Sequence, residues 1–423
     1  MNRRWTLVRE LAIGILINLV VLGFARFAYG VILPFMQKSL GLSYTQAGIL
    51  GAATALGYVG FVIPAGAVAS RIGSKITFAS GLLLCTVSLF VLGWTQSFWT
   101  ALVWMFLAGV GTSFSYTPLV GYFMERYPQI RATVTGIISG GAGVGMLVVG
   151  FIVPFLNHLS PERGWRDAWL LFSVVGMLTF ALALTLAPVK RKRDLNEEMQ
   201  DVSAGEAKSH DNLPGARDIG PDLRAAVYLN PRVLLYGWIY FTIGLSYLIP
   251  PTFLLAFMIH AGMTPALAGT WVSLNGLLGI LSGPLWGILA DRFGIRGVFR
   301  LSILLNMVAL FLPMFRDSAL SFLIASLLLG LTVGGVIALL LASVSQQVNM
   351  RDVPAALGYV TFYFGMGQLL GPMIAGWMID SWNHGFAAAF GFAGAALGLG
   401  LLMTFLERGE KVVTAIQKQS IDS

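Results

Sequence analysis

One arginine stands inside an otherwise apolar stretch near the beginning of the chain. Arg26 interrupts the apolar run from Leu11 to Met36, about three positions past the middle of a segment over residues 11–35. In a membrane helix this position lies roughly 4–5 Å from the midplane, at 1.5 Å per residue. A charge at that depth is costly unless it is paired or faces water. Because a guanidinium can donate two parallel hydrogen bonds to a carboxylate, the position predicts a binding site for an organic anion.

Acidic side chains that could neutralise Arg26 are missing from the middle of every long apolar segment. Glu10, Glu125, Asp380 and Glu407 all fall at segment ends. Two interpretations of Arg26 therefore stay open. Either it binds a substrate anion or takes part in gating, or it has a structural role, in which it snorkels outward, bonds to helix carbonyls or pairs with Asp380.

Neutral polar side chains fall near the same depth in other apolar segments. Each can make a hydrogen bond without the penalty of a charge, although each alone could equally hold two helices together. Tyr29 follows Arg26 by three residues, on nearly the same helix face, and could orient it. Together these residues predict one cavity that binds the anion: Arg26, Tyr29, Tyr58, Tyr116, Tyr247, Asn275, Tyr363 and Gln368.

The sequence shows no pattern of catalytic or metal-binding residues. The single cysteine, Cys85, excludes an intramolecular disulfide and any site with several cysteine ligands. The glycine-rich run at residues 141–145 lies within an apolar segment with no strand before it, which disfavours a nucleotide site. We therefore expect no enzyme activity, no cofactor, no metal and no nucleic-acid partner.

The composition indicates that membrane helices carry these residues. The chain is 57% hydrophobic and 11% charged, with a mean hydropathy of +0.78, whereas soluble domains carry roughly 25% charged residues. A spanning helix needs about 20 mostly apolar residues. Segments of this kind are predicted at 11–35, 45–69, 76–95, 99–123, 133–156, 167–187, 234–257, 265–289, 298–315, 319–344, 354–379 and 386–406.

An internal repeat relates the two halves of the chain. The pattern at Gly66–Lys75 recurs at Gly287–Arg296, an offset of 221 residues (287 − 66), and the same offset relates Gly23 to Gly244. Duplicated halves are typical of carriers that rock one bundle against the other. The sequence thus predicts an all-α membrane protein, with twelve transmembrane helices in two pseudo-symmetric six-helix bundles.

The positive charges set the expected orientation. If both termini are cytoplasmic, the outer loops hold four of the 27 basic residues, Arg26 lies in the membrane, and the other 22 (27 − 4 − 1) are cytoplasmic, as the positive-inside rule requires. We expect an N-terminal bundle over 1–187, a cytoplasmic linker over 188–232, and a C-terminal bundle with a cytoplasmic tail over 233–423. This is the pattern of a multi-pass protein of a bacterial-type inner membrane, expected to function as a monomer.

The repeated loops resemble the signature of the major facilitator superfamily. The loop at 287–296 reads Gly-x-x-x-Asp-Arg-x-Gly-x-Arg, and the loop at 66–75 departs from it with Ser70 in place of the acid. Glycine-rich runs at 140–145 and 365–372 extend the resemblance. The Arg-Phe-Ala-Tyr run at residues 26–29 is similar to a bacterial subgroup for which the resemblance identifies no substrate.

This resemblance implies a secondary active transporter that works by alternating access. Its partners would be the lipid bilayer and a small-molecule substrate, with or without a coupled proton, and the substrate would be a small organic anion held by Arg26. The repeated loops are expected to act as conformational latches that close the cytoplasmic side. Their residues are Gly66, Arg71, Gly73, Gly287, Asp291, Arg292, Gly294 and Arg296.

Two alternatives remain beside the organic-anion carrier. One is an exporter of amphipathic or drug-like compounds, against which Met105 counts, because many proton-antiporting members carry an arginine there. The other is a non-transporting membrane sensor on the same fold, against which Arg26 and Asp291 count. Gly279 and Gly283 stand where oxalate- and monocarboxylate-type members carry an arginine, which argues against close kinship with those two groups.

Overall fold

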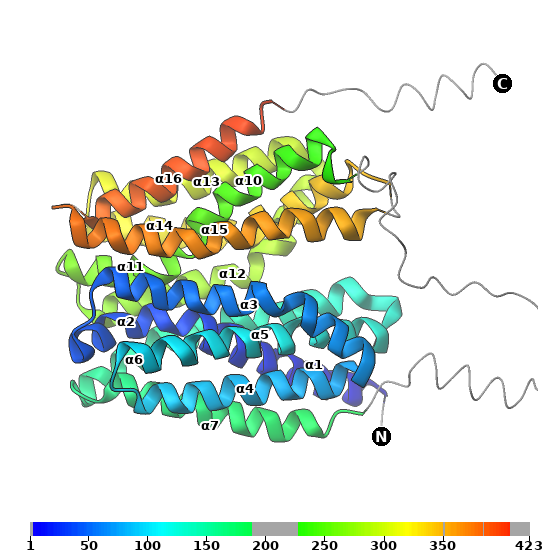
Figure 1. Cartoon of the computed structure of the whole chain (residues 1–423). Helices are drawn as coiled ribbons and strands as arrows, with labels where there is room; N and C mark the ends of the chain where they lie inside the picture. The colour runs from blue at the N-terminus through cyan, green and yellow to red at the C-terminus, as the bar shows by residue number, and fades with distance from the viewer. Residues whose placement is uncertain (1–2, 188–226, 350–351, 384, 407–423) are drawn as a thin grey trace, which may run out of the picture.

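The protein consists of long helices whose axes are nearly parallel (Figure 1). The computed structural model describes residues 3–187, 227–349, 352–383 and 385–406, and within these ranges it contains no strand. The predicted linker up to residue 226 and the tail from residue 407 lie outside the described residues. The first half of the chain and the second half form two bundles that lie against each other (Figure 1).

The helices correspond to the twelve segments expected from the sequence. Eleven of the described helical stretches are long and apolar enough to cross a membrane, and α15 is a further helix of 29 residues. The first bundle contains α1 (Arg3–Asn18), η1 (Leu19–Phe27), α2 (Ala28–Leu40), α3 (Tyr44–Ile72), α4 (Ser74–Trp94), α5 (Phe98–Arg126), η2 (Pro128–Ile130), α6 (Arg131–Leu159) and α7 (Gly164–Leu184). The second contains α10 (Pro231–Tyr247), α11 (Ile249–His260), α12 (Pro265–Phe293), α13 (Ile295–Phe315), α14 (Ala319–Ser345), α15 (Val353–Ser381) and α16 (Gly385–Met403).

The first spanning stretch is not a regular α-helix. Its middle, η1, is π-helical over Leu19–Phe27 and continues directly into α1 and α2. Short π-helical insertions are frequent at functional sites, because they change the direction in which side chains leave the helix. The seventh predicted segment is likewise two helices, α10 and α11, which meet at Leu248. Pro250 and Pro251 follow this break, and proline has no N–H for helix hydrogen bonds.

The two signature loops form equivalent tight turns. Gly73 joins α3 to α4 with φ of +98°, and Gly294 joins α12 to α13 with φ of +87°. Each donates its N–H to the carbonyl four residues earlier, Ala69 and Ala290 respectively, at 2.9 Å. Positive φ strains any residue with a Cβ. The shared conformation explains why glycine occupies both positions of the repeat.

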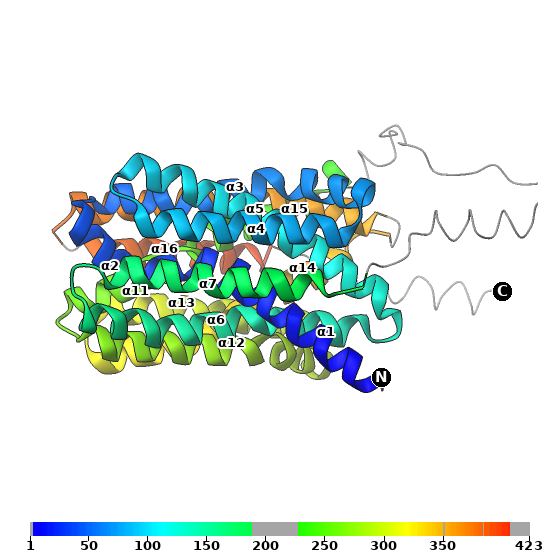
Figure 2. The same ribbon diagram turned by 90° about the horizontal axis from the view of Figure 1, so that it is seen from below.

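The two ends of the bundle need separate names. We call the end where the described chain starts at residue 3 and stops at residue 406 the terminal face, and the opposite end the distal face (Figure 1). Helices of the two halves pack together in three pairs: α3 with α15, α6 with α12 and α2 with α11. Figure 2 shows α6 beside α12.

Glycines bring the backbones of the two halves together near the distal face. A Cβ on Gly30 would overlap the carbonyl of Pro251, and a Cβ on Gly48 would overlap that of Pro372. Gly150 of α6 makes a similarly close contact with the carbonyl of Gly269 in α12. We call these contacts, Gly30 on Pro251, Gly48 on Pro372 and Gly150 on Gly269, the distal seam. Small residues permit such close approach between membrane helices.

The same helices lose these contacts towards the terminal face. Cβ atoms added to Gly60 and Gly66 on α3, or to Gly283 and Gly287 on α12, would have no heavy atom within 4 Å. The same holds for Gly358 on α15. The halves are therefore joined tightly in their distal part and separate towards the terminal face.

Candidate functional site

Arg26 lies between the two halves with a neutral partner. Its Nη2 donates a hydrogen bond to Oε1 of Gln368 over 2.6 Å, and its Cζ lies 4.6 Å from the centre of the Tyr58 ring. Arg26 comes from η1, Tyr58 from α3 and Gln368 from α15, so both halves contribute. The ion pairs among the described residues are Arg126–Glu10 and Arg163–Asp167, and neither contains Arg26. The predicted pairing of Arg26 with Asp380 is therefore not formed.

Part of the guanidinium has no hydrogen-bond partner. Nε of Arg26 is buried and makes no hydrogen bond to any described residue. The arginine as a whole is half-buried, whereas Gln368 is 2% exposed. A buried amide acceptor satisfies one donor without neutralising the charge. The arrangement thus leaves Arg26 able to receive an anion on its remaining donors.

Three tyrosines of the predicted set lie around this arginine. Tyr58 and Tyr247 both lie close enough to Arg26 for electrostatic interaction, and Tyr116 lies close to both of these tyrosines. They come from α3, α10 and α5 respectively, and each is half-buried. Arg26, Tyr58, Tyr116, Tyr247 and Gln368 therefore form one group.

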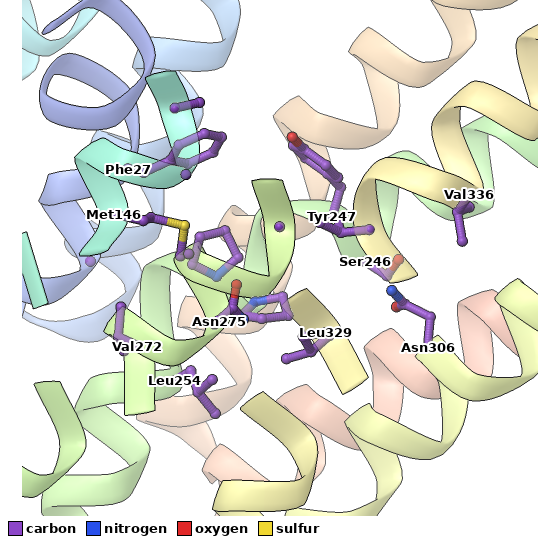
Figure 3. A pocket seen from close by; sticks show the side chains of 18 of the residues that line it. Phe27, Met146, Ser246, Tyr247, Leu254, Val272, Asn275, Asn306, Leu329 and Val336 are labelled. Atoms are coloured by element: carbon purple, nitrogen blue, oxygen red, sulfur yellow. The ribbon is translucent and has the colours of Figure 1, made fainter. Parts of the chain in front are cut away.

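A cavity of about 200 Å³ lies beside this group (Figure 3). We call it the side chamber. No charged residue lines it, and most of its wall is apolar. Tyr247 and the predicted residue Asn275 both face it from the second half. Its lining residues include Phe27, Val31, Ser139, Gly143, Met146, Ser246, Tyr247, Leu254, Val272, Asn275, Gly279, Asn306, Leu329, Val333 and Val336.

Two of the predicted residues make other contacts. The hydroxyl of Tyr29 is buried and donates to the carbonyl of Ala47 at 2.9 Å, so it does not orient Arg26 as expected. The expectation assumed an α-helical face shared by positions three apart, and the π-helical segment removes that register. The Tyr363 hydroxyl lies 3.1 Å from that of Tyr359, which contacts the Tyr228 ring, closer to the terminal face.

Sequence reasoning missed several polar residues near the site. Thr54 and Thr252 line a small pocket that also contains Arg26 and Met105. Asn306 lines the side chamber, where its Nδ2 donates to Oγ1 of Thr332 at 2.8 Å. Its position at the middle of the predicted segment 298–315 was a usable signal, because an amide at that depth needs a partner. No comparable sequence signal distinguishes Thr54 and Thr252.

A second polar contact joins the halves, at the distal face. Asp380, at the end of α15, accepts the N–H of Tyr44 at Oδ1 over 2.9 Å and the N–H of Thr45 at Oδ2 over 2.6 Å. These N–H groups open α3, where Ser43 also forms a capping box with Gln46. A carboxylate is favourable at a helix N-terminus, whose free N–H groups carry partial positive charge. Asp380 thus ties the second half to the first.

The latch residues predicted from the signature lie exposed at the terminal face. Asp291 and Arg292 are exposed, as are Arg71 and Arg296. Asp291 forms no ion pair with a residue in the described part of the chain. Lys75, in the first copy, donates to the carbonyls of Leu184 and Leu186 within its own half. Within the described ranges, Asp291 of the second latch loop thus makes no ion pair with the first half.

One buried acid stabilises the first half near the terminal face. Glu10 is 1% exposed and forms an ion pair with Arg126 at 3.2 Å. It also accepts the hydroxyl of Tyr127, in the loop after α5, at 2.6 Å. Burial raises the pKa of Tyr127 to about 12, and the hydrogen bond to Glu10 acts in the same direction, so the hydroxyl stays a donor. This cluster is structural and lies away from Arg26.

Comparison with known proteins decides the family. The Major Facilitator Superfamily model matches residues 15–261, which is more than half of the chain. The chain belongs to the major facilitator superfamily. A second family model, described as the uncharacterised MFS-type transporter YbfB, matches residues 218–405. This major facilitator protein is therefore a multi-pass membrane transporter, as the sequence signature predicted.

Relatives of this major facilitator protein include bacterial and vertebrate transporters. It is 26% identical to the MFS-type transporter YceJ of Bacillus subtilis, over 93% of this chain and 96% of that protein. It is 24% identical to monocarboxylate transporter 12-B of Danio rerio, over 80% and 74% of the two chains. It is 23% identical to the probable sulfoacetate transporter SauU of Cupriavidus necator, over 93% and 92%. The similarity therefore extends to a monocarboxylate transporter, despite the glycines at 279 and 283.

Solved structures of the superfamily share the fold. The nucleoside transporter NupG superposes with a TM-score of 0.74 at 14% identity, over 97% of this chain and 100% of that one. A bacterial homolog of the human lysosomal transporter Spinster, in an inward-facing and unoccupied conformation, gives 0.71 at 16% identity, over 96% of each chain. At these identities the likeness concerns the fold alone.

Proposed function

We propose that this transporter is a secondary carrier of a small organic anion, whose carboxylate binds Arg26. The observation that carries this proposal is the uncompensated guanidinium. Arg26 makes one hydrogen bond to a neutral amide, stacks on Tyr58, and keeps a buried Nε that has no hydrogen-bond partner among the described residues. A charge at this depth is costly to maintain. An arriving carboxylate supplies the missing negative charge and accepts two parallel hydrogen bonds.

The names of two relatives support an organic anion as the substrate. One is a monocarboxylate transporter and another a probable sulfoacetate transporter. Both names denote small anions with an organic body. The tyrosines and amides around Arg26 would then position the body, because they hydrogen-bond without adding charge. The substrate would enter the group formed by Arg26, Tyr58, Tyr116, Tyr247 and Gln368.

The carrier would work by alternating access, in a bacterial-type inner membrane with its terminal face in the cytoplasm. The positive-inside rule supports this orientation, because 22 of the 27 basic residues belong to segments on that side. Trp94, Trp99 and Trp382 are exposed near the distal face, where amphipathic rings suit a membrane interface. Closed at the distal seam and separated towards the terminal face, the two bundles would then be in the inward-open state.

The latch loops would form contacts in the opposite state. On closing the terminal face, Asp291 could reach the start of α6, whose N-cap residue Ile130 makes no side-chain hydrogen bond. A carboxylate at such an N-terminus is stabilising. Ser70, which replaces the acid in the first loop, would give a weaker contact. The latches are therefore assigned to the outward-open state, in which the distal seam is broken.

Uptake into membrane vesicles tests the role of Arg26. Arg26→Gln removes the charge, and losing a charge-assisted pair worth about 3 kcal/mol lowers affinity on the order of 100-fold. Arg26→Lys keeps the charge but loses the bidentate hydrogen bonding of the guanidinium, so we expect a transport rate between those of wild type and Arg26→Gln. Arg316→Gln, at an exposed arginine of the distal face, is the matched control. Unchanged transport of every anion by Arg26→Gln would refute the proposal.

The apolar lining of the side chamber also supports a second candidate function, the export of amphipathic compounds. No charged residue lines this cavity, and amphipathic molecules suit such walls. Transport of neutral amphipaths that is insensitive to Arg26→Gln would favour the exporter. Transport that depends on both Arg26 and a substrate carboxylate would exclude it.

A further inference from the structure

We propose that the side chamber binds the apolar body of the substrate, so that the transported anion is a monocarboxylate carrying an aryl or branched alkyl group of about the size of benzene. This inference rests on the proposed function of Arg26. It adds a second subsite with its own chemistry, and it narrows the substrate class from small organic anions to amphipathic monocarboxylates.

The side chamber adjoins the anion position. Gly30 and Pro251 line both the side chamber and the small pocket that contains Arg26. Tyr247 lines the chamber and lies close enough to Arg26 for electrostatic interaction. In Figure 3 the Tyr247 ring stands at the edge of the chamber, opposite Phe27. A carboxylate bound at Arg26 therefore leaves the rest of its molecule next to the chamber opening.

The lining of the chamber suits an uncharged group. Its polar side chains are few, and two of them are already engaged. Ser246 donates to the carbonyl of Ile243 at 2.9 Å, and Asn306 donates to Thr332 at 2.8 Å. The Asn275 amide and the Tyr247 hydroxyl make no hydrogen bond to a residue of the described chain and face the cavity, where they could accept or donate one bond. A second carboxylate would enter this space without a basic partner, so the chamber disfavours dicarboxylates.

The size of the chamber sets the size of the group. Its volume is about 200 Å³, and an apolar protein cavity of about 150 Å³ is known to bind benzene. Each methylene moved from water into an apolar site contributes about fourfold in affinity. Burial of three or more carbons should therefore raise the affinity of a carboxylate at least about 50-fold over that of acetate.

One glycine allows the chamber to be filled selectively. Gly279 of α12 lines it, and a Cβ there would have only the Gly330 carbonyl oxygen within 4 Å, at 3.9 Å. Gly279→Leu should thus be accommodated by the backbone and occupy the cavity. Gly283 lies one turn further along the same helix, outside the lining, with no atom within 4 Å of an added Cβ. Gly283→Leu is the matched control, because it makes the same change in helix propensity and side-chain volume.

The test compares three probes by isothermal titration with the purified full chain. Wild type should bind phenylacetate at least about 50-fold more tightly than acetate, and more tightly than phenylacetamide. Gly279→Leu should abolish the preference for phenylacetate over acetate. Gly283→Leu should keep the wild-type preference. The wild-type series decides the question by itself if a variant fails to fold.

The outcomes separate this inference from the proposal on Arg26. Equal binding of phenylacetate and phenylacetamide would refute the carboxylate role of Arg26, and with it the inference. A clear preference for the acid, with acetate and phenylacetate bound about equally, would overturn the side-chamber subsite alone. A size preference that survives Gly279→Leu would also overturn it, because the apolar group would then bind elsewhere.

Discussion

Neutralising Asp380 is expected to loosen the distal closure of the two halves by about 2 kcal/mol. The carboxylate of Asp380 accepts two backbone N–H groups at the start of α3, at 2.9 and 2.6 Å. Asp380→Asn keeps one acceptor oxygen and loses the charge. A hydrogen bond to a charged group contributes about 1.5 kcal/mol at the low end, which suits an exposed carboxylate, and the charge at the helix N-terminus adds about 0.5 kcal/mol. At about 1.4 kcal/mol per factor of ten, the equilibrium for opening the distal face should rise roughly 30-fold.

A buried reporter in the distal part measures this opening. Thr252 is 5% exposed and lies against Gly51 of the other half. In a Cys85→Ala background, Thr252→Cys presents one thiol that a membrane-impermeant maleimide reaches only when the distal face opens. The modification rate from that side should be roughly 30-fold higher with Asp380→Asn than without it, following the change in opening equilibrium.

A matched control isolates the contact from a general effect of charge. Asp317 is an exposed acid in the turn between α13 and α14, on the same face. Asp317→Asn should leave the modification rate within about twofold, because interactions between exposed charges are largely screened. A rate for Asp380→Asn within about twofold of the parent would show that the cap does not contribute to distal closure.

Further predictions concern the packing of the two halves and the first bundle. Gly48→Ala places a Cβ against a carbonyl of α15, so it should also increase the rate of maleimide labelling at the distal face. Gly60→Ala, on the same helix but with no atom near the added Cβ, should leave that rate unchanged. Equal labelling rates for the two variants would contradict the steric role of the distal seam. Glu10→Ala leaves Arg126 without its partner and should lower the free energy of unfolding by about 2 kcal/mol, measured in detergent as a lower thermal midpoint. Exposed Glu162→Ala should leave that midpoint within about 1 °C, since surface substitutions change stability little.

The fold was predictable because it depends on features that are local in the sequence. Runs of about 20 apolar residues identify membrane helices without any knowledge of their neighbours. The repeat carried the positive-φ glycines, Gly73 and Gly294, into equivalent turns. The break between α10 and α11, beside Pro250 and Pro251, is also predictable from the missing N–H groups of proline, although the segment 234–257 was predicted as one helix.

The site was predictable only in part, because it depends on helix rotation and pairing. The group around Arg26 was found from depth alone, including Gln368, which lies 342 residues away in the chain. Tyr29 was misjudged because the π-helical segment η1 changes the register that sequence spacing assumes. Tyr363 lies five residues before Gln368 on α15, about 7.5 Å along the axis at 1.5 Å per residue, and depth estimates from segment ends do not resolve that difference.

The contact of Asp380 with α3 illustrates what sequence alone does not contain. Its sequence position marks only an acid at the end of a helix. Its effect depends on the start of α3, 335 residues away, lying opposite it. Such pairings follow from the way the two bundles dock, and neither a spacing rule nor the 221-residue offset predicts them.

In the proposed rocking motion, the distal seam would act as a mechanical stop. Main chain meets main chain at Gly30, Gly48 and Gly150, so the bundles cannot approach further without atomic overlap. Because the packed backbone is nearly incompressible, the angle at which the halves come to rest is set there and not by the side chains around Arg26. Residues that select the substrate can therefore change without altering the position at which the rocking motion ends. Substrate specificity and the extent of the rocking motion can thus diverge independently during evolution.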